Sequence, residues 1–237
     1  MKYPRMRKRR RVLKGMIGFL VRRLGELEVE GLENVPSSGP VIIAGNHFNF
    51  VDPPLLIYTT PRMVEFIGGA QRPNSPFWAQ QIPKWYGFIH AFRGGYGRST
   101  FRQSLDILKQ EGILGIFPEG GSWATLLRPA RPGLAYIASK SGAPVVPISI
   151  VGAENLIGGK KQAVKIIYHS PVPAPVITAS GAERRKQLDD FSREIMARIA
   201  SGLPDEQRGM HSTSADARAA AEAVSDYPFD APELRGM

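Results

Sequence analysis

Residues 41–52 of the chain read Val-Ile-Ile-Ala-Gly-Asn-His-Phe-Asn-Phe-Val-Asp, an apolar run followed at once by polar side chains. The apolar run is typical of a strand buried on both faces of a parallel sheet. It leads to His47, just before a helix predicted from Asp52 to Tyr58 with prolines in its first turn. A neutral imidazole is the commonest general base near neutral pH, and a buried carboxylate fixes its tautomer. His47 and Asp52 are therefore a candidate catalytic pair, although a packed histidine would give the same local pattern.

Apolar strands and helices alternate along the rest of the chain. Strands are predicted at 27–31, 63–67, 87–92, 113–117, 145–151 and 164–168, and helices at 76–81, from 99, at 133–141 and at 181–201. This order predicts an α/β fold in which a mostly parallel or mixed central sheet is covered by helices on both faces. We expect the main domain to span 26–211. Residues 212–237 are rich in Ala, Ser, Asp and Glu without a period, which predicts a disordered tail.

The positive charge of the chain is concentrated at its start. The net charge is +10, and the first 23 residues hold ten basic residues and no acidic one. Leu13, Ile17, Leu20 and Leu24 share one face of a predicted helix in this segment. The apolar stretch of this helix, residues 12–24, would be only about 20 Å long, which is short of the roughly 30 Å hydrocarbon core of a bilayer. Residues 1–25 are therefore predicted to be a basic amphipathic helix that lies on an anionic membrane surface.

Cysteine is absent from all 237 residues. A thiol nucleophile, a cysteine-based zinc site, an iron–sulfur cluster and a disulfide framework are thereby excluded. The base at His47 must act on something other than a protein thiol.

Three loops are predicted to meet at one edge of the sheet, because each follows the carboxyl end of a strand. They contain His47–Asp52, Arg93–Gly97 and Glu119–Ser122. If they converge, one site holds a base, a cation and a carboxylate. The base suits proton removal from a hydroxyl, and the cation with a glycine-opened backbone suits an anionic group such as phosphate.

Four blocks of the sequence together resemble the glycerolipid acyltransferase superfamily, which includes 1-acylglycerol-3-phosphate acyltransferase. The blocks are Asn46-His47 with Asp52, Gly87 through Arg93, Phe117-Pro118-Glu119-Gly120, and Val145-Val146-Pro147-Ile148. Each block is weak alone, but all four occur in order at family-like spacing. The resemblance extends from about residue 29 to residue 209.

The resemblance implies an enzyme that joins an acyl thioester to a lysophospholipid, most directly 1-acylglycerol-3-phosphate. On this reading His47 removes the proton of the acceptor hydroxyl and Asp52 orients His47. Arg93 is expected to hold the acceptor phosphate. Glu119 is expected to orient either the glycerol or the Arg93 side of the site. Asn46 and Gly120 complete the expected substrate-binding residues. Backbone amides at 46–49 or 120–121 are the two candidate sources of an oxyanion hole.

The third block departs from the family pattern, which usually continues Thr-Arg-Ser where this chain has Gly121-Ser122-Trp123. The family arginine at this place commonly provides a second cation for the acceptor phosphate. Arg128 and Arg131 are the two candidates to replace it. Otherwise the acceptor is a different lyso-lipid.

The partners implied by the resemblance are an anionic membrane surface, a lysophospholipid, and acyl-CoA or acyl-carrier protein as co-substrate. We expect no other cofactor, no metal ion and no nucleic acid. A peripheral or monotopic place on the cytoplasmic face of the cell membrane follows from the basic helix and the lipid substrates.

Two alternatives use other parts of the chain. Gly120–Ala124 resembles a degenerate serine elbow, so that Ser122 with His169 or His211 would make an esterase of the α/β-hydrolase type. This leaves His47 and Asp52 unexplained. In a second alternative the chain is a non-enzymatic module whose basic segment binds nucleic acid or lipid, but the rest of the chain has no basic stripe with interleaved aromatic residues.

Overall fold

A computed structural model describes residues 2–68, 77–90, 97–153, 156 and 162–225 of the chain. The strands are β1 (Gly25–Glu30), β2 (Val41–Gly45), β3 (Val64–Gly68), β4 (Ile89–His90), β5 (Ile113–Ile116), β6 (Val145–Val151) and β7 (Gln162–Tyr168). The helices are α1 (Arg7–Leu24), α2 (Asp52–Thr59), α3 (Phe77–Tyr86), α4 (Arg98–Lys109), α5 (Leu134–Ser141), α6 (Gly181–Ser201) and α7 (Ala215–Ala223). Short 3-10 turns lie at Leu32–Asn34, Asp205–Gln207 and Gly209–His211.

Within the described part of the chain, these strands form one seven-stranded sheet in the order β1-β7-β6-β2-β5-β3-β4. Neighbouring strands are parallel except β6 and β7, which pair antiparallel. The predicted α/β fold with a mostly parallel sheet is confirmed. The carboxyl ends of β2, β5 and β6 therefore open at the same edge.

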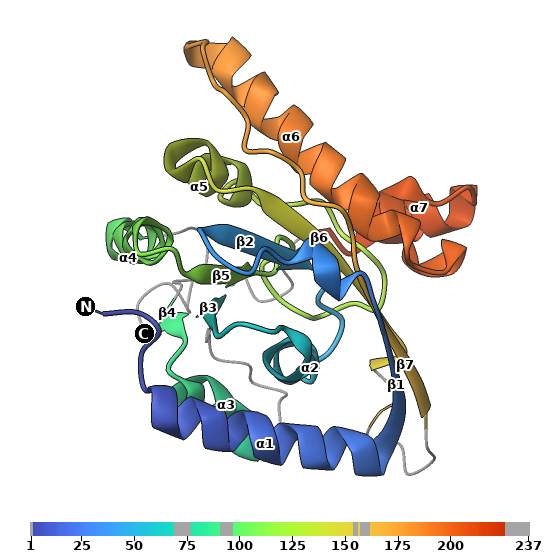
Figure 1. Cartoon of the computed structure of the whole chain (residues 1–237). Helices are drawn as coiled ribbons and strands as arrows, with labels where there is room; N and C mark the ends of the chain where they lie inside the picture. The colour runs from blue at the N-terminus through green and yellow to red at the C-terminus, as the bar shows by residue number, and fades with distance from the viewer. Residues whose placement is uncertain (1, 69–76, 91–96, 154–155, 157–161, 226–237) are drawn as a thin grey trace.

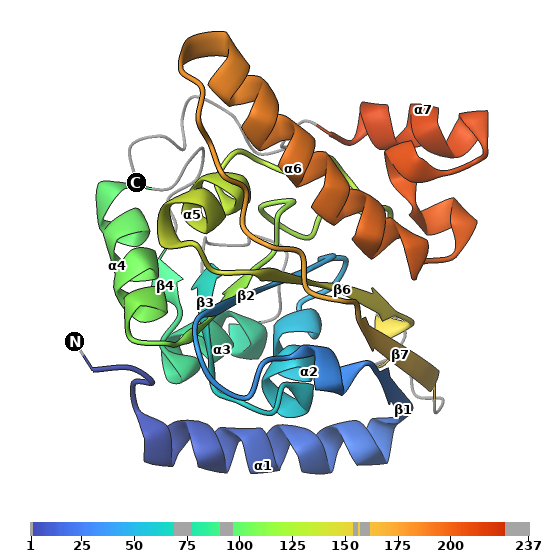
Figure 2. The same ribbon diagram turned by 45° about the horizontal axis from the view of Figure 1, so that its top comes forward.

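The sheet is covered on both faces, because successive side chains of a strand point to opposite sides. In β2, Ile42 and Ala44 pack in the core beneath α4, α5 and α6, whereas Val41 and Ile43 pack in the core that includes α2 and α3. Figures 1 and 2 show this arrangement, with α1 lying outside α2 and α3 as an additional layer. The near-continuous apolar strands of the sequence are explained by burial on both sides.

The first helix is docked on the body through buried polar contacts. The Arg10 guanidinium is 1% exposed and donates to both carboxylate oxygens of Glu65 in β3, at 2.5 and 2.8 Å. It also donates to the Tyr86 carbonyl and lies over the Tyr86 ring. A second arginine, Arg5, pairs with the same carboxylate at 2.8 Å. Two charged hydrogen-bonding partners offset the cost of burying Glu65.

This docking corrects the predicted apolar face of α1. Leu13 and Ile17, two residues of the predicted face, pack against the body, and Val21 beside them is buried. Leu20 and Leu24, however, face solvent together with Val12, Met16 and Phe19. The helix is apolar on two sides, and the buried Arg10 sets which side meets the body. No helix in the described ranges is both long enough and apolar enough to cross a membrane.

The prediction of a disordered tail is wrong for residues 215–223, which form α7. The alanines that give this segment no hydrophobic period also have the highest helix propensity. Ser214 caps the helix by accepting from Ala217 N, and Arg218 donates to the Ser212 and Thr213 carbonyls at 2.8 and 3.0 Å. Residues 226–237 lie outside the described ranges.

Candidate active site

The loop between β2 and α2 brings His47 and Asp52 together. His47 Nδ1 lies 3.0 Å from Asp52 Oδ2, and the same oxygen accepts from the backbone N–H groups of Phe48 and Asn49 at 2.8 Å each. Asp52 is the first residue of α2, where the helix dipole favours a negative charge. The predicted contact between the two side chains is confirmed.

His47 is held in a defined ring orientation. Its ring stacks on Phe117 with centroids 4.2 Å apart, and the residue is 6% exposed. With Nδ1–H donated to the Asp52 carboxylate, the lone pair lies on Nε2. The geometry therefore assigns proton transfer to Nε2, with Asp52 stabilising the imidazolium that forms.

Glu119 connects the third block to the base. It is 1% exposed, and its Oε1 accepts from the His47 backbone N–H at 2.7 Å. Its Oε2 accepts from the Arg128 backbone N–H at 3.1 Å and pairs with the Arg128 guanidinium. Burial raises the pKa of Glu119 to about 7, and the nearby Arg128 charge opposes that rise. Both oxygens are engaged inside the protein, so the expectation that Glu119 touches the substrate gives way to a positioning role.

Asn46 is likewise used to hold the fold. Its side-chain amide donates to the Ile150 carbonyl at 2.9 Å, and its oxygen accepts from the Ile150 N–H at 2.8 Å. This pair continues the β2–β6 ladder beyond Gly45, where the backbone of β2 turns away. Asn46 is 1% exposed and its amide is engaged at both ends, which favours a role in positioning His47 over the substrate contact expected from the sequence.

The amides of the first block are also committed. Those of His47, Phe48 and Asn49 donate to carboxylates, and the Gly120 amide donates to the Phe117 carbonyl at 3.0 Å. Of the two predicted sources of an oxyanion hole, the 120–121 turn can therefore contribute through the Gly121 N–H, because the Gly120 N–H already has an acceptor.

Of the two arginines that follow the third block, Arg128 is taken up by the interior. Its side chain is 1% exposed, pairs with Glu119 and donates to the Gly121 carbonyl. Its guanidinium also lies 3.5 Å from the ring centroid of Trp123, a close cation–π contact. This engagement inside the protein makes Arg128 the weaker of the two candidates for the replacement cation.

Arg131 lies instead beside the glycine turn and is partly exposed. Gly120 has φ +80°, and a Cβ placed there would come within 2.8 Å of Arg131 Cδ. A glycine is needed at 120 both for this backbone conformation and for this close approach. Arg131 is thus the stronger candidate for the replacement cation.

Arg93 and the loop that follows β4 lie outside the described residues. The convergence predicted from the sequence is confirmed for the His47 and Glu119 loops, which the hydrogen bond between them joins.

The alternative site at Ser122 receives no support. In the described part of the chain, Ser122 Oγ has no hydrogen-bond partner. His169 bonds Ser149 Oγ at 2.7 Å, and it follows β7, whose end lies at the opposite edge of the sheet from His47. His211 lies in a 3-10 turn, and in the described part of the chain it makes no hydrogen bond to Ser122 Oγ; burial lowers the pKa of His211. Nor do the described residues hold any cluster of three metal-binding side chains.

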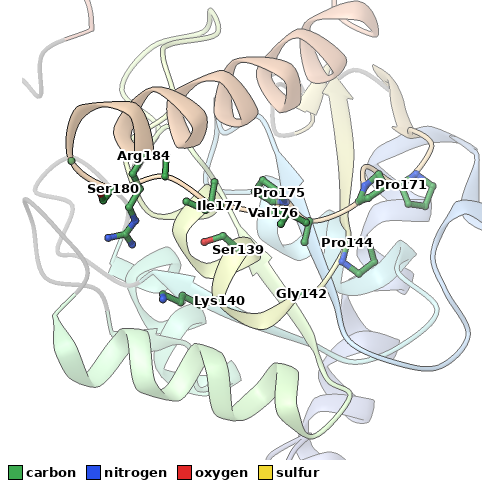
Figure 3. A pocket seen from close by; sticks show the side chains of 14 residues that line it. Ser139, Lys140, Gly142, Pro144, Pro171, Pro175, Val176, Ile177, Ser180 and Arg184 are labelled. Atoms are coloured by element: carbon green, nitrogen blue, oxygen red, sulfur yellow. The ribbon is translucent and has the colours of Figure 1, made fainter.

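A groove of about 910 Å³ lies away from the dyad, between the end of α5 and the extended segment before α6 (Figure 3). Pro144 and Gly142 mark its place at the amino ends of the parallel strands, and Lys140 and Arg184 line it. None of the residues predicted for the site lines this groove.

The sequence pattern of the Acyltransferase family matches residues 26–151, more than half of the chain. The chain belongs to this family. It is 28% identical over 160 residues to a chloroplastic 1-acyl-sn-glycerol-3-phosphate acyltransferase of Brassica napus, which covers 61% of this chain and 44% of that protein. It is 28% identical over 155 residues to a 1-acyl-sn-glycerol-3-phosphate acyltransferase of Bacillus subtilis, covering 62% and 74%. The chain thus spans less than half the length of the plant relative.

The fold of this family member is also found in a solved structure. The crystal structure of the 1-acyl-sn-glycerophosphate acyltransferase from Thermotoga maritima superposes with a TM-score of 0.57. The two chains are 24% identical, and the match covers 86% of this chain and 83% of that one. The superposition supports the arrangement of the sheet and its helices.

Two site residues of this acyltransferase-family chain were not anticipated from its sequence. Phe117 stacks on His47, and Trp123 lies against Arg128 and over the glycine turn. An aromatic residue directly before Pro-Glu-Gly, and one directly after the altered third block, are the signals that point to them.

Proposed function

We propose that this protein transfers a fatty acyl group from an acyl thioester to the free hydroxyl of a lysophospholipid, most directly 1-acylglycerol-3-phosphate, which gives phosphatidic acid. The observation that carries the proposal is the buried His47–Asp52 pair, in which a carboxylate holds the ring of a candidate general base. The names of the Brassica and Bacillus relatives support the choice of acceptor.

The reaction follows from the geometry of the pair. His47 Nε2 takes the proton of the acceptor hydroxyl while that oxygen attacks the thioester carbonyl. The new carbon–oxygen bond forms a tetrahedral oxyanion, for which the Gly120–Gly121 turn is the candidate donor. Collapse breaks the carbon–sulfur bond, and the imidazolium returns its proton to the leaving thiolate. The products are an ester and a free thiol, and no acyl-enzyme is needed.

The acceptor phosphate needs a cation near the base. Arg131 borders Gly120, which directly follows the residue that anchors the His47 backbone. A planar guanidinium donates two parallel hydrogen bonds to a phosphate. In our proposal Arg131 holds the phosphate in place of the missing third-block arginine, together with Arg93 as the family resemblance implies. Acyl-CoA or acyl-carrier protein is the co-substrate, with no other cofactor.

The outward face of α1 suits attachment to a membrane surface. Val12, Met16, Phe19 and Leu20 are each more than half exposed on this helix, and Trp85 at the neighbouring end of α3 is 56% exposed. Exposed arginines and lysines flank them, a combination that favours the interface of an anionic bilayer. We place the protein on the cytoplasmic face of the cell membrane, with the basic helix on lipid and not on nucleic acid.

A panel of lyso-acceptors tests this function. The full chain is incubated with radiolabelled acyl-CoA and, in parallel, lysophospholipids that differ in headgroup. We expect labelled phosphatidic acid from 1-acylglycerol-3-phosphate and none from the folded His47→Ala variant. Transfer to a different headgroup would identify another lyso-lipid as the acceptor, and full activity of His47→Ala would refute the mechanism.

A further inference from the structure

Trp123 directly follows position 122, where the family pattern has the arginine that this chain lacks. Its ring lies over the glycine turn at 120–121. A Cβ on Gly121 would come within 2.6 Å of Trp123 Cζ3. One face of the indole carries the Arg128 guanidinium, and the Arg131 guanidinium carbon lies 5.8 Å from the ring centroid. The same ring is thus in contact range of the buried arginine and of the arginine proposed to hold the acceptor phosphate.

The indole N–H is held by a distant part of the chain. Trp123 Nε1 donates to the Val224 carbonyl at 2.9 Å, across 101 positions of sequence. Val224 is the C-terminal cap of α7. An indole N–H that leaves water needs such a partner, so the end of α7 sets the plane of the ring.

The helix α7 is anchored to the same loop at a second place. It packs on the 3-10 turn Gly209–His211, and Ala221 is fully buried in that contact. The preceding turn accepts from the loop, since Leu127 N donates to the Gln207 carbonyl at 2.8 Å. Residues 203–225 therefore hold the segment 123–128 at both ends.

We propose that α7 is part of the acceptor site, acting through Trp123 as a positioning residue for Arg131. This inference rests on the proposed function. Displacing α7 lets the indole rotate, and its cation–π contact with Arg131 is lost. Acceptor binding should then weaken, while the affinity for the acyl thioester should not change, because Arg131 is assigned to the acceptor alone. Because coupling between two sites is reciprocal, acceptor bound at Arg131 should also stabilise α7.

Kinetics of two variants and their combination test the coupling. Ala221→Arg displaces α7 from its buried contact, and Trp123→Phe keeps a ring but removes the donated hydrogen bond. We expect each to raise the KM for 1-acylglycerol-3-phosphate by roughly three- to tenfold, as loss of one hydrogen bond predicts, with the acyl-CoA KM changed by less than about twofold. The double variant should be no worse than the worse single one, because both break the same chain of contacts. Glu222→Gln, on the exposed side of α7, is the matched control and should behave as the unaltered chain.

Hydrogen exchange gives a readout that needs no turnover. Trp123→Phe should speed amide exchange in residues 215–223 of the substrate-free protein. 1-Acylglycerol-3-phosphate should slow this exchange in the unaltered chain but not in Trp123→Phe.

Arg218→Ala, which removes the bonds to the Ser212 and Thr213 carbonyls, serves as a milder variant if Ala221→Arg does not fold. Additive effects on the acceptor KM, equal rises in both KM values, or faster exchange in α7 with an unchanged acceptor KM would each overturn the inference. If the unaltered chain acylates no lyso-acceptor, both the proposed function and this inference are refuted. If it does, and the variants of α7 leave the acceptor KM unchanged, only the inference is refuted.

Discussion

The backbone N–H of His47 donates to the carboxylate of Glu119 at 2.7 Å, although 72 positions of sequence separate the two residues. The carboxylate of the third block therefore sets where the base of the first block stands. Its other oxygen takes the Arg128 amide, so one buried side chain ties the base to the loop that carries Arg131. The first and third blocks of the sequence thus form one hydrogen-bonded unit.

Stability should fall as pH rises through the titration of Glu119. In the folded protein its pKa is raised to about 7, from an ordinary value of 4.5. The folded state therefore binds one more proton than the unfolded chain between these values, so this contribution to stability is fully present below 4.5 and is lost by the time the pH passes 7. At about 1.4 kcal/mol for each pKa unit, the effect is about 3 kcal/mol.

Glu119→Gln tests this, because glutamine does not titrate. We expect the difference in free energy of unfolding between pH 5 and pH 8, measured by urea denaturation, to be smaller in the variant by about that amount. Exposed Glu222→Gln is the control for removal of a surface carboxylate. An identical pH dependence in Glu119→Gln and the unaltered chain would contradict the raised pKa.

Asp52→Asn should lower kcat by roughly 10²- to 10⁴-fold with little change in either KM. The amide oxygen of asparagine can still accept from the Phe48 and Asn49 N–H groups, but it cannot stabilise a positively charged His47. The measurement is steady-state kinetics with both substrates, beside a thermal melt that checks the fold. A loss of affinity with an unchanged kcat would mean that Asp52 acts in binding.

Variants of Arg131 and Arg128 distinguish a residue that binds the acceptor from one that stabilises the fold. Arg131→Ala should raise the KM for 1-acylglycerol-3-phosphate at least tenfold, because a charge-assisted hydrogen bond is worth about 1.5–3 kcal/mol, and should leave the acyl-CoA KM unchanged. Arg128→Ala should instead lower the melting temperature, because it leaves the buried Glu119 without its cation. An acceptor KM that is indifferent to Arg131→Ala would remove Arg131 from the acceptor site.

The sequence predicted the parts of this protein that local pattern controls. The buried strand before His47, the long helix at Gly181–Ser201 and the strand at Val145–Val151 were all placed correctly, since apolar period and turn residues determine them. The contact between His47 and Asp52 followed from their spacing at a helix start. Roles that depend on long-range burial did not follow: Asn46 and Glu119 look like substrate-binding residues until their partners, Ile150 and the His47 backbone, are known.

The same limit applies at both ends of the chain. No local pattern distinguishes the buried Arg10 from its basic neighbours in α1, because its partner Glu65 lies in β3, far along the sequence. The choice of which apolar side of α1 meets the body therefore could not be predicted. For α7, a weak hydrophobic period concealed a helix that is stabilised by contacts with residues 209–213.

Attachment to lipid should depend on the side of α1 that carries Val12, Met16 and Phe19. A triple serine variant of these positions removes exposed apolar surface without touching the contacts of Arg10 or Val21. We expect it to lose co-sedimentation with vesicles containing anionic lipid by tenfold or more, because each buried apolar side chain contributes about 1.5–3 kcal/mol, while it still acylates dispersed acceptor. Val176→Ser is the matched control, since Val176 is 84% exposed on the extended segment before α6. Leu13→Ser, on the inward side, should instead lower the melting temperature. Unchanged vesicle binding of the triple variant would show that lipid meets another surface.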